Sequence, residues 1–93
     1  MIKGLSEKNY KIIKDIISRY DAEFYAYGSR VKGDYTDLSD LDILVKAENF
    51  DEIHSVLCNE FDKSLLPFVV NLTNYYGIDK KFYNLIEKDL VKI

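Results

Sequence analysis

The sequence predicts a small α/β (α+β) domain, a mixed sheet of three to four strands flanked by helices in the order α-β-β-α-β-α. Stretches with apolar residues at helical spacing alternate along the chain with short stretches rich in β-branched and aromatic residues. Such alternation is typical of a sheet covered by helices. Because 93 residues, 47% of them hydrophobic, can form one core but not two, we expect a single domain over residues 1–93.

The first part of the chain is expected to form a helix, a strand and a turn. Ser6 suits the N-cap of a helix over residues 7–19. Its apolar stripe consists of Ile12, Ile13, Ile16, Ile17 and Tyr20. The aromatic segment Glu23–Tyr27 predicts a strand that runs directly into a turn at Gly28. Residues 30–35 suit a short helix or an irregular loop, and residues 34–39 are rich in loop formers.

The middle of the chain is expected to form a strand and a helix. Leu41–Lys46 predicts the second strand, and its period of two separates two faces. One face carries Leu41, Ile43 and Val45, and the other carries Asp40, Asp42 and Leu44. Residues 48–51 supply a helix start, and the apolar periodicity continues to about residue 62.

The last third is expected to contain a strand and a helix. Residues 65–73 are β-rich and predict a third strand, with Pro67 at its start or on an edge because proline cannot donate to a ladder. Residues 74–78 are expected to form a loop. A final helix is expected over residues 79–89, with an apolar stripe formed by Phe82, Leu85 and Ile86.

Composition excludes several classes of protein. The net charge of −3 argues against strong general binding of nucleic acid, although a local basic patch is compatible with it. The single Cys58 cannot form an internal disulfide, which fits a reducing compartment. The sequence has no signal core and no apolar run of about twenty residues, so we expect a cytoplasmic protein without membrane contacts.

Two short motifs suggest a nucleoside triphosphate and metal site. The Gly28-Ser29 turn leaves backbone N–H groups free to face an anion, and Arg30 follows it with positive charge. Asp40 and Asp42 stand two apart, so both carboxylates lie on one face of a strand, where they suit Mg²⁺. Taken singly, the turn is more often plain loop punctuation, and the carboxylates could be solvated or capping groups. Their conjunction in this order favours the functional interpretation.

The same residues carry a family resemblance. Gly28-Ser29, Arg30, Gly33 and the run from Ser39 to Val45 resemble the glycine-serine and S-D-x-D motifs of DNA polymerase β-like nucleotidyltransferases. The order of elements is similar to that of the shortest members, the minimal nucleotidyltransferases. The resemblance covers nearly the whole chain and implies transfer of a nucleotide from ATP with Mg²⁺ as cofactor.

The resemblance also implies roles for individual residues. Gly28 and Ser29 would hold the triphosphate with help from Arg30, and Asp40 and Asp42 would bind the metal ion. Ser39 is assigned to the nucleotide site with them, although it could equally cap the strand entry. The family usually has a third catalytic carboxylate on the later strand, and here Asn71 occupies that position. An amide oxygen can ligate a metal but cannot act as a base.

Three functions remain open. The resemblance to minimal nucleotidyltransferases implies an antitoxin that transfers AMP from ATP to a helical HEPN-type partner toxin, with which it would form a hetero-oligomer. The substitution at Asn71 favours an alternative, in which the protein neutralises its partner by binding alone. An enzyme that modifies a small molecule is favoured less, because the chain offers no second domain to shape an acceptor pocket.

Overall fold

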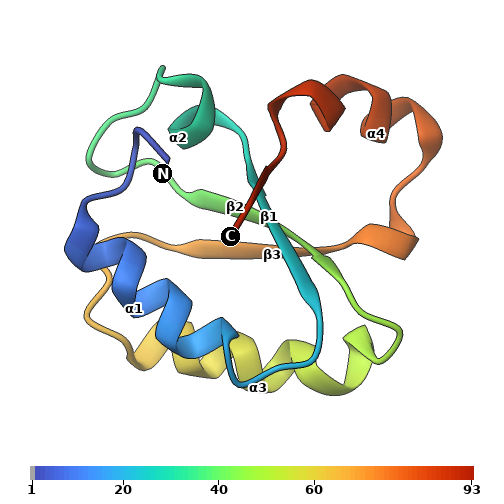
Figure 1. Ribbon diagram of the computed structural model, residues 1–93, viewed down its shortest axis with the longest axis horizontal. Coiled ribbons are helices and arrows are strands. Elements are labelled where there is room, and N and C mark those ends of the chain that lie inside the picture. Colours follow the sequence, from blue (N-terminus) through green and yellow to red (C-terminus); the bar gives the residue numbers. More distant parts are fainter. Residues whose placement is uncertain (1) are drawn as a thin grey trace.

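The computed structural model describes residues 2–93 and confirms the predicted α/β class, a sheet flanked by helices (Figure 1). The elements follow one another as α1 (Glu7–Ile17), β1 (Glu23–Tyr27), α2 (Ser29–Lys32), β2 (Leu41–Lys46), α3 (Phe50–Lys63), β3 (Val70–Asn74), the 3₁₀ turn η1 (Tyr75–Gly77), α4 (Lys80–Ile86), the 3₁₀ turn η2 (Glu87–Asp89) and β4 (Val91–Lys92). Within residues 2–93, no helix combines the length and apolar character that a membrane span requires.

The sheet is mixed, with strand order β3-β2-β1-β4. β1 runs antiparallel to both β2 and β4, whereas β2 and β3 are parallel. A parallel pair needs a long crossover, and α3 provides it. The first residues of β2 and β3 therefore meet at the same end of the sheet, where the register places Asp42 opposite Asn71.

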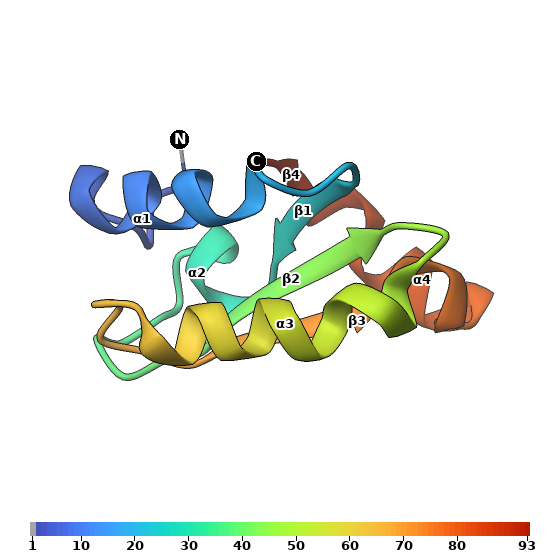
Figure 2. The same cartoon turned by 90° about the horizontal axis from the view of Figure 1, so that it is seen from below.

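The hydrophobic core lies between one face of the sheet and the helices α1 and α3 (Figures 1 and 2). The predicted alternation of β2 is confirmed, since Leu41, Ile43 and Val45 are fully buried on this face. Ile13 of α1 and Leu57 of α3 are also fully buried and contribute to the same cluster. This core fixes the orientation of β2 and so directs the alternate residues to the opposite face.

The opposite face is partly covered by α4, which lies on the other side of the sheet from α1 and α3 (Figure 1). Leu44 on this face is fully buried, and Tyr27 of β1 is 8% exposed. The rings of Tyr27 and Phe82 meet edge to face, with centroids 6.1 Å apart. The face that carries Asp42 is therefore apolar toward α4 and polar toward the start of β2.

Several predicted boundaries are wrong. The third strand begins at Val70 rather than residue 65. Its register pairs Val70 with Leu41, the first residue of β2, so the residues before Val70 lie beyond the start of the neighbouring strand. Residues 75–77 form a 3₁₀ turn instead of an irregular loop. The last predicted helix ends at Ile86 and continues as η2. The short β4, which completes four strands, pairs Val91 with Ala26.

Candidate nucleotidyltransferase site

The turn after β1 is built on a glycine conformation. Gly28 has φ 86° and ψ −159°, a region that is essentially restricted to glycine. Its carbonyl oxygen accepts hydrogen bonds from the N–H groups of Val31 and Lys32, at 3.1 and 3.0 Å, and so starts α2. Ser29 is the first residue of α2 and is half-buried. The first N–H groups of a helix have no carbonyl partner within it, so this turn presents donors to an anion.

The same glycine lets the turn approach a carboxylate of the candidate metal site. A Cβ atom at Gly28 would lie 2.6 Å from Oδ2 of Asp42. Real Cβ atoms do not come this close to another heavy atom, so any side chain here would displace the carboxylate. β1 and β2 are adjacent, and their register pairs Tyr27 with Asp42. The sheet therefore places the Gly28 turn and the carboxylate of Asp42 side by side.

The three predicted catalytic residues converge on one point. The side-chain amide of Asn71 donates to Oδ2 of Asp40 at 3.0 Å and to Oδ1 of Asp42 at 3.2 Å. Asp40 and Asn71 are exposed, and Asp42 is half-buried. Asp40 immediately precedes β2, whereas Asn71 is the second residue of β3. The structure thus brings together residues that are separated by about a third of the chain.

The geometry tests whether these residues fit a metal ion. The amide of Asn71 places a polarised NH₂ group between two carboxylates, which is where a cation would balance their charge. Two hard carboxylate oxygens beside a glycine turn with free N–H donors suit Mg²⁺, which completes its shell with substrate oxygens and water. Within residues 2–93, no three histidine, cysteine, aspartate or glutamate side chains form a metal cluster. The donor set that fits Mg²⁺ is therefore Asp40 and Asp42, with the amide as neighbour.

Arg30 has a different place from the one that the sequence suggested. Its side chain is 4% exposed, and its guanidinium donates to the carbonyl oxygens of Gly4, Ser39, Thr36 and Asp37 at 2.6 to 3.4 Å. The guanidinium carbon also lies 4.0 Å from the centroid of the Phe68 ring. These contacts engage both ends of the guanidinium, so they favour a structural role for Arg30, which holds the loop that leads to Asp40, over the predicted contact with phosphate.

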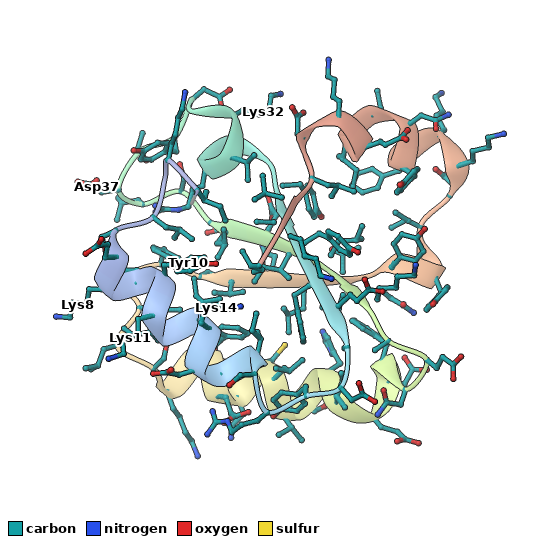
Figure 3. All side chains as sticks on the ribbon, viewed as in Figure 1. Lys8, Tyr10, Lys11, Lys14, Lys32 and Asp37 are labelled. Atoms are coloured by element: carbon teal, nitrogen blue, oxygen red, sulfur yellow. The ribbon has the colours of Figure 1, made fainter. Side chains whose placement is uncertain are left out.

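Ser39 also stabilises this loop. Its hydroxyl oxygen accepts a hydrogen bond from the backbone N–H of Thr36 at 2.9 Å and lies 3.4 Å from the hydroxyl of Thr36. Its carbonyl oxygen accepts from Arg30 at 2.8 Å. Of the two interpretations of Ser39, the geometry favours the structural one at the entry to β2. Lys32 is the other basic residue of α2, and it is exposed at the end of this helix (Figure 3).

Two residues that shape the site were missed by sequence reasoning. Gly4 accepts from Arg30 and donates its N–H to the Arg30 carbonyl oxygen at 3.0 Å, and a Cβ at Gly4 would lie 2.6 Å from Cβ of Arg30. An isolated glycine just before a helix cap was the only signal for this close approach. The sequence indicates Tyr27 only as a strand residue, yet its hydroxyl lies 3.3 Å from that of Thr73, and its cross-strand partner is Asp42. Burial, together with the negative charge of Asp42, raises the pKa of Tyr27 despite the hydrogen bond with Thr73.

The fold and this site define a class of protein. A glycine turn between a strand and a short helix, next to paired carboxylates at the start of the neighbouring strand, is the arrangement of a nucleotidyltransferase. The chain belongs to the nucleotidyltransferase domain family, whose model matches residues 10–93. No curated protein matches the sequence.

Proposed function

We propose that this protein is the antitoxin of a toxin–antitoxin pair and that it transfers AMP from ATP to a HEPN-type toxin, which this modification neutralises. The proposal rests on membership of the nucleotidyltransferase domain family and on the resemblance to minimal nucleotidyltransferases. The observation that carries it is the convergence of Asp40, Asp42 and Asn71 beside the Gly28 turn.

The openness of the site supports a protein acceptor. Asp40 and Asn71 are exposed at the end of the sheet where β2 and β3 begin. A small acceptor is usually held in a concave pocket. A surface hollow of about 670 Å³ lies at the opposite end of β1 and β2, where Glu23 and Lys46 line it. An exposed reaction centre suits an acceptor side chain that projects from a partner protein.

The chemistry assigns a task to each group. An acceptor oxygen attacks the α-phosphorus of ATP, a new P–O bond forms, the bond between the α- and β-phosphates breaks, and pyrophosphate leaves. The turn at Gly28 and Ser29 holds the triphosphate, and Asp40 and Asp42 hold Mg²⁺. When bound, the metal ion supplies neutralisation of the charge that develops on the phosphate oxygens. The acceptor hydroxyl also loses its proton, which solvent water at the exposed site can receive.

The amide of Asn71 supports a second candidate function. A carboxylate at this position would add negative charge to the metal site and a base near the acceptor, and an amide provides neither. The amide also donates to both aspartates, so a cation that enters must displace its NH₂ group or turn its oxygen inward. A protein that retains the fold and binds its partner tightly, without turnover, would neutralise the toxin by masking it.

A transfer assay tests the first function. The purified protein is incubated with ATP labelled on the α-phosphate, Mg²⁺ and the HEPN-type protein that the proposal expects to be encoded beside its gene. We expect label on the partner, and we expect Asp42→Asn to abolish it. The matched control is Asp37→Asn, which neutralises an exposed loop carboxylate away from the convergence point (Figure 3). A stable complex that gains no label at any Mg²⁺ concentration would refute transfer and support neutralisation by binding.

A second substitution tests the part played by Asn71. Asn71→Asp should raise the rate of label transfer if the amide limits the reaction. Asn74→Asp is the matched control, because Asn74 lies at the far end of β3, opposite Val45, and its side chain accepts from the N–H of Tyr76, which a carboxylate also can. Equal rates for wild type and Asn71→Asp would show that the amide does not limit the transfer.

A further inference from the structure

The helix α4 places an aromatic side chain beside the candidate site. Asp79 is its N-cap, and Oδ1 of Asp79 accepts from the N–H of Phe82 at 2.7 Å, which fixes Phe82 in the first turn. The Phe82 ring stands nearly perpendicular to the ring of Tyr27, at 83°, with centroids 6.1 Å apart. The contact connects α4 to the last residue of β1, directly before the Gly28 turn.

Phe82 combines a fixed position with an open surface. Tyr27 is 8% exposed, whereas Phe82 is 36% exposed. In a perpendicular contact, at least one face of the Phe82 ring is not covered by Tyr27. Tyr27 is the cross-strand partner of Asp42, and directly opposed side chains in a sheet have Cβ atoms about 4.5–5.5 Å apart. Tyr27 therefore lies next to both Phe82 and Asp42, and this places Phe82 near the candidate metal site.

We propose that the open face of Phe82 holds the base of the bound nucleoside triphosphate by stacking. The inference rests on the proposed nucleotide site, because it takes the triphosphate at Gly28 and Ser29 as its starting point. A nucleotide held there by its phosphates has its ribose and base nearby, and aromatic rings bind bases through their faces without regard to sequence. Stacking of this kind accepts every base, so Phe82 strengthens binding of nucleotides generally and does not by itself select adenine.

Other exposed apolar residues fit this role less well. Tyr76 is 58% exposed, but it lies in η1 beyond the far end of β3 and lines the hollow at the opposite end of the sheet. Leu85 is 68% exposed on the same helix, but it has no aromatic face. Of these three residues, Phe82 is the one whose aromatic ring packs against Tyr27, at the strand end that carries the turn.

Titration calorimetry with two ligands in the presence of Mg²⁺ tests the proposal. The ligands are ATP and inorganic triphosphate, which lacks the base. Phe82→Leu keeps an apolar side chain against Tyr27 but removes the aromatic face, and we expect it to weaken ATP about tenfold and to leave inorganic triphosphate unchanged. Phe82→Tyr should bind ATP as wild type does. Leu85→Ala, on the same helix, should leave both ligands unchanged.

The outcomes separate this inference from the function on which it rests. If wild type binds both ligands and Phe82→Leu binds ATP as tightly as wild type, the stacking role is wrong and the nucleotide site stands. An equal loss of ATP and inorganic triphosphate would also overturn it, because a structural effect explains such a loss. If wild type binds neither ligand, the nucleotide site itself is refuted and the stacking role falls with it.

Discussion

Replacement of Gly28 by alanine tests how closely the turn and the carboxylate of Asp42 depend on each other. The backbone of Gly28, at φ 86° and ψ −159°, lies in a region where a side chain costs about 1–3 kcal/mol. The new Cβ would also lie 2.6 Å from Oδ2 of Asp42, so the carboxylate must rotate away. Because Oδ1 of the same carboxylate accepts from Asn71 at 3.2 Å, the rotation also weakens that hydrogen bond, at a cost of about 1 kcal/mol.

A second glycine provides the matched control for Gly28→Ala. Gly33 has φ 101°, so alanine there is also strained, but a Cβ at Gly33 would have no neighbouring atom within 4 Å. Gly33→Ala should therefore cost about 1–2 kcal/mol through strain alone. Gly28→Ala should cost about 2–4 kcal/mol in free energy of unfolding, and its melting temperature should fall further than that of Gly33→Ala by about 4–8 °C for each additional kcal/mol.

Urea unfolding followed by circular dichroism, together with ATP affinity in the presence of Mg²⁺, measures both effects. We expect Gly28→Ala to lower stability and to weaken ATP binding, and Gly33→Ala to lower stability only. Equal destabilisation by the two substitutions, with ATP affinity unchanged in both, would refute the close approach of the turn to Asp42 as a functional feature.

Three further predictions concern the scaffold of the site. Arg30→Lys should lower the free energy of unfolding, measured in urea titrations, by about 3 kcal/mol or more, because a single ammonium cannot replace the guanidinium on four carbonyl oxygens. The control Lys32→Ala, at an exposed position of α2, should change it by less than about 0.5 kcal/mol. Leu57→Ala should cost about 2–5 kcal/mol by the same measurement, since Leu57 is fully buried, and the neighbouring Val56→Ala, 52% exposed, should cost much less. The pKa of Tyr27 is raised in the folded state, so its contribution to stability is complete below pH 10 and is lost as the pH rises through the folded pKa. Tyr27→Phe should therefore reduce the loss of stability that is measured above pH 10.

The elements that carry the site could be predicted because local signals define them. The bounds of β1 and β2 are confirmed, and the predicted helix over residues 7–19 matches α1 to within two residues. Ser6 does cap this helix, since its hydroxyl accepts from the N–H of Asn9 at 3.1 Å. The alternation in β2 predicted that Asp42 lies on the face opposite Leu41, Ile43 and Val45, because successive side chains of a strand point to opposite faces.

The features that sequence reasoning missed depend on contacts between distant segments. The position of Arg30 is set by Gly4 near the N-terminus and by the loop before β2, and nothing in the residues beside Arg30 indicates these partners. The length of β3 is set by where β2 begins, so an apolar run that starts at residue 65 cannot reveal it. The strand β4 has two residues and forms only because β1 offers a free edge.

The convergence of Asp40, Asp42 and Asn71 combines both kinds of information. Sequence spacing predicted the two aspartates on one face, and the family resemblance pointed to the position of Asn71. Only the parallel pairing of β2 with β3 shows that the amide lies within hydrogen-bond distance of both carboxylates. The site therefore holds two carboxylates and an amide that already occupies the place between them.

Mg²⁺-dependent binding of ATP tests this account most directly. Calorimetric titration of ATP into wild type, with Mg²⁺ and with a chelator, should show binding that requires the metal ion, and Asp42→Asn should weaken it by at least tenfold while Asp37→Asn leaves it unchanged. ATP binding that is equally tight with the chelator, or equally tight in Asp42→Asn, would contradict the assignment of Asp40 and Asp42 beside the Gly28 turn as the nucleotide–metal site.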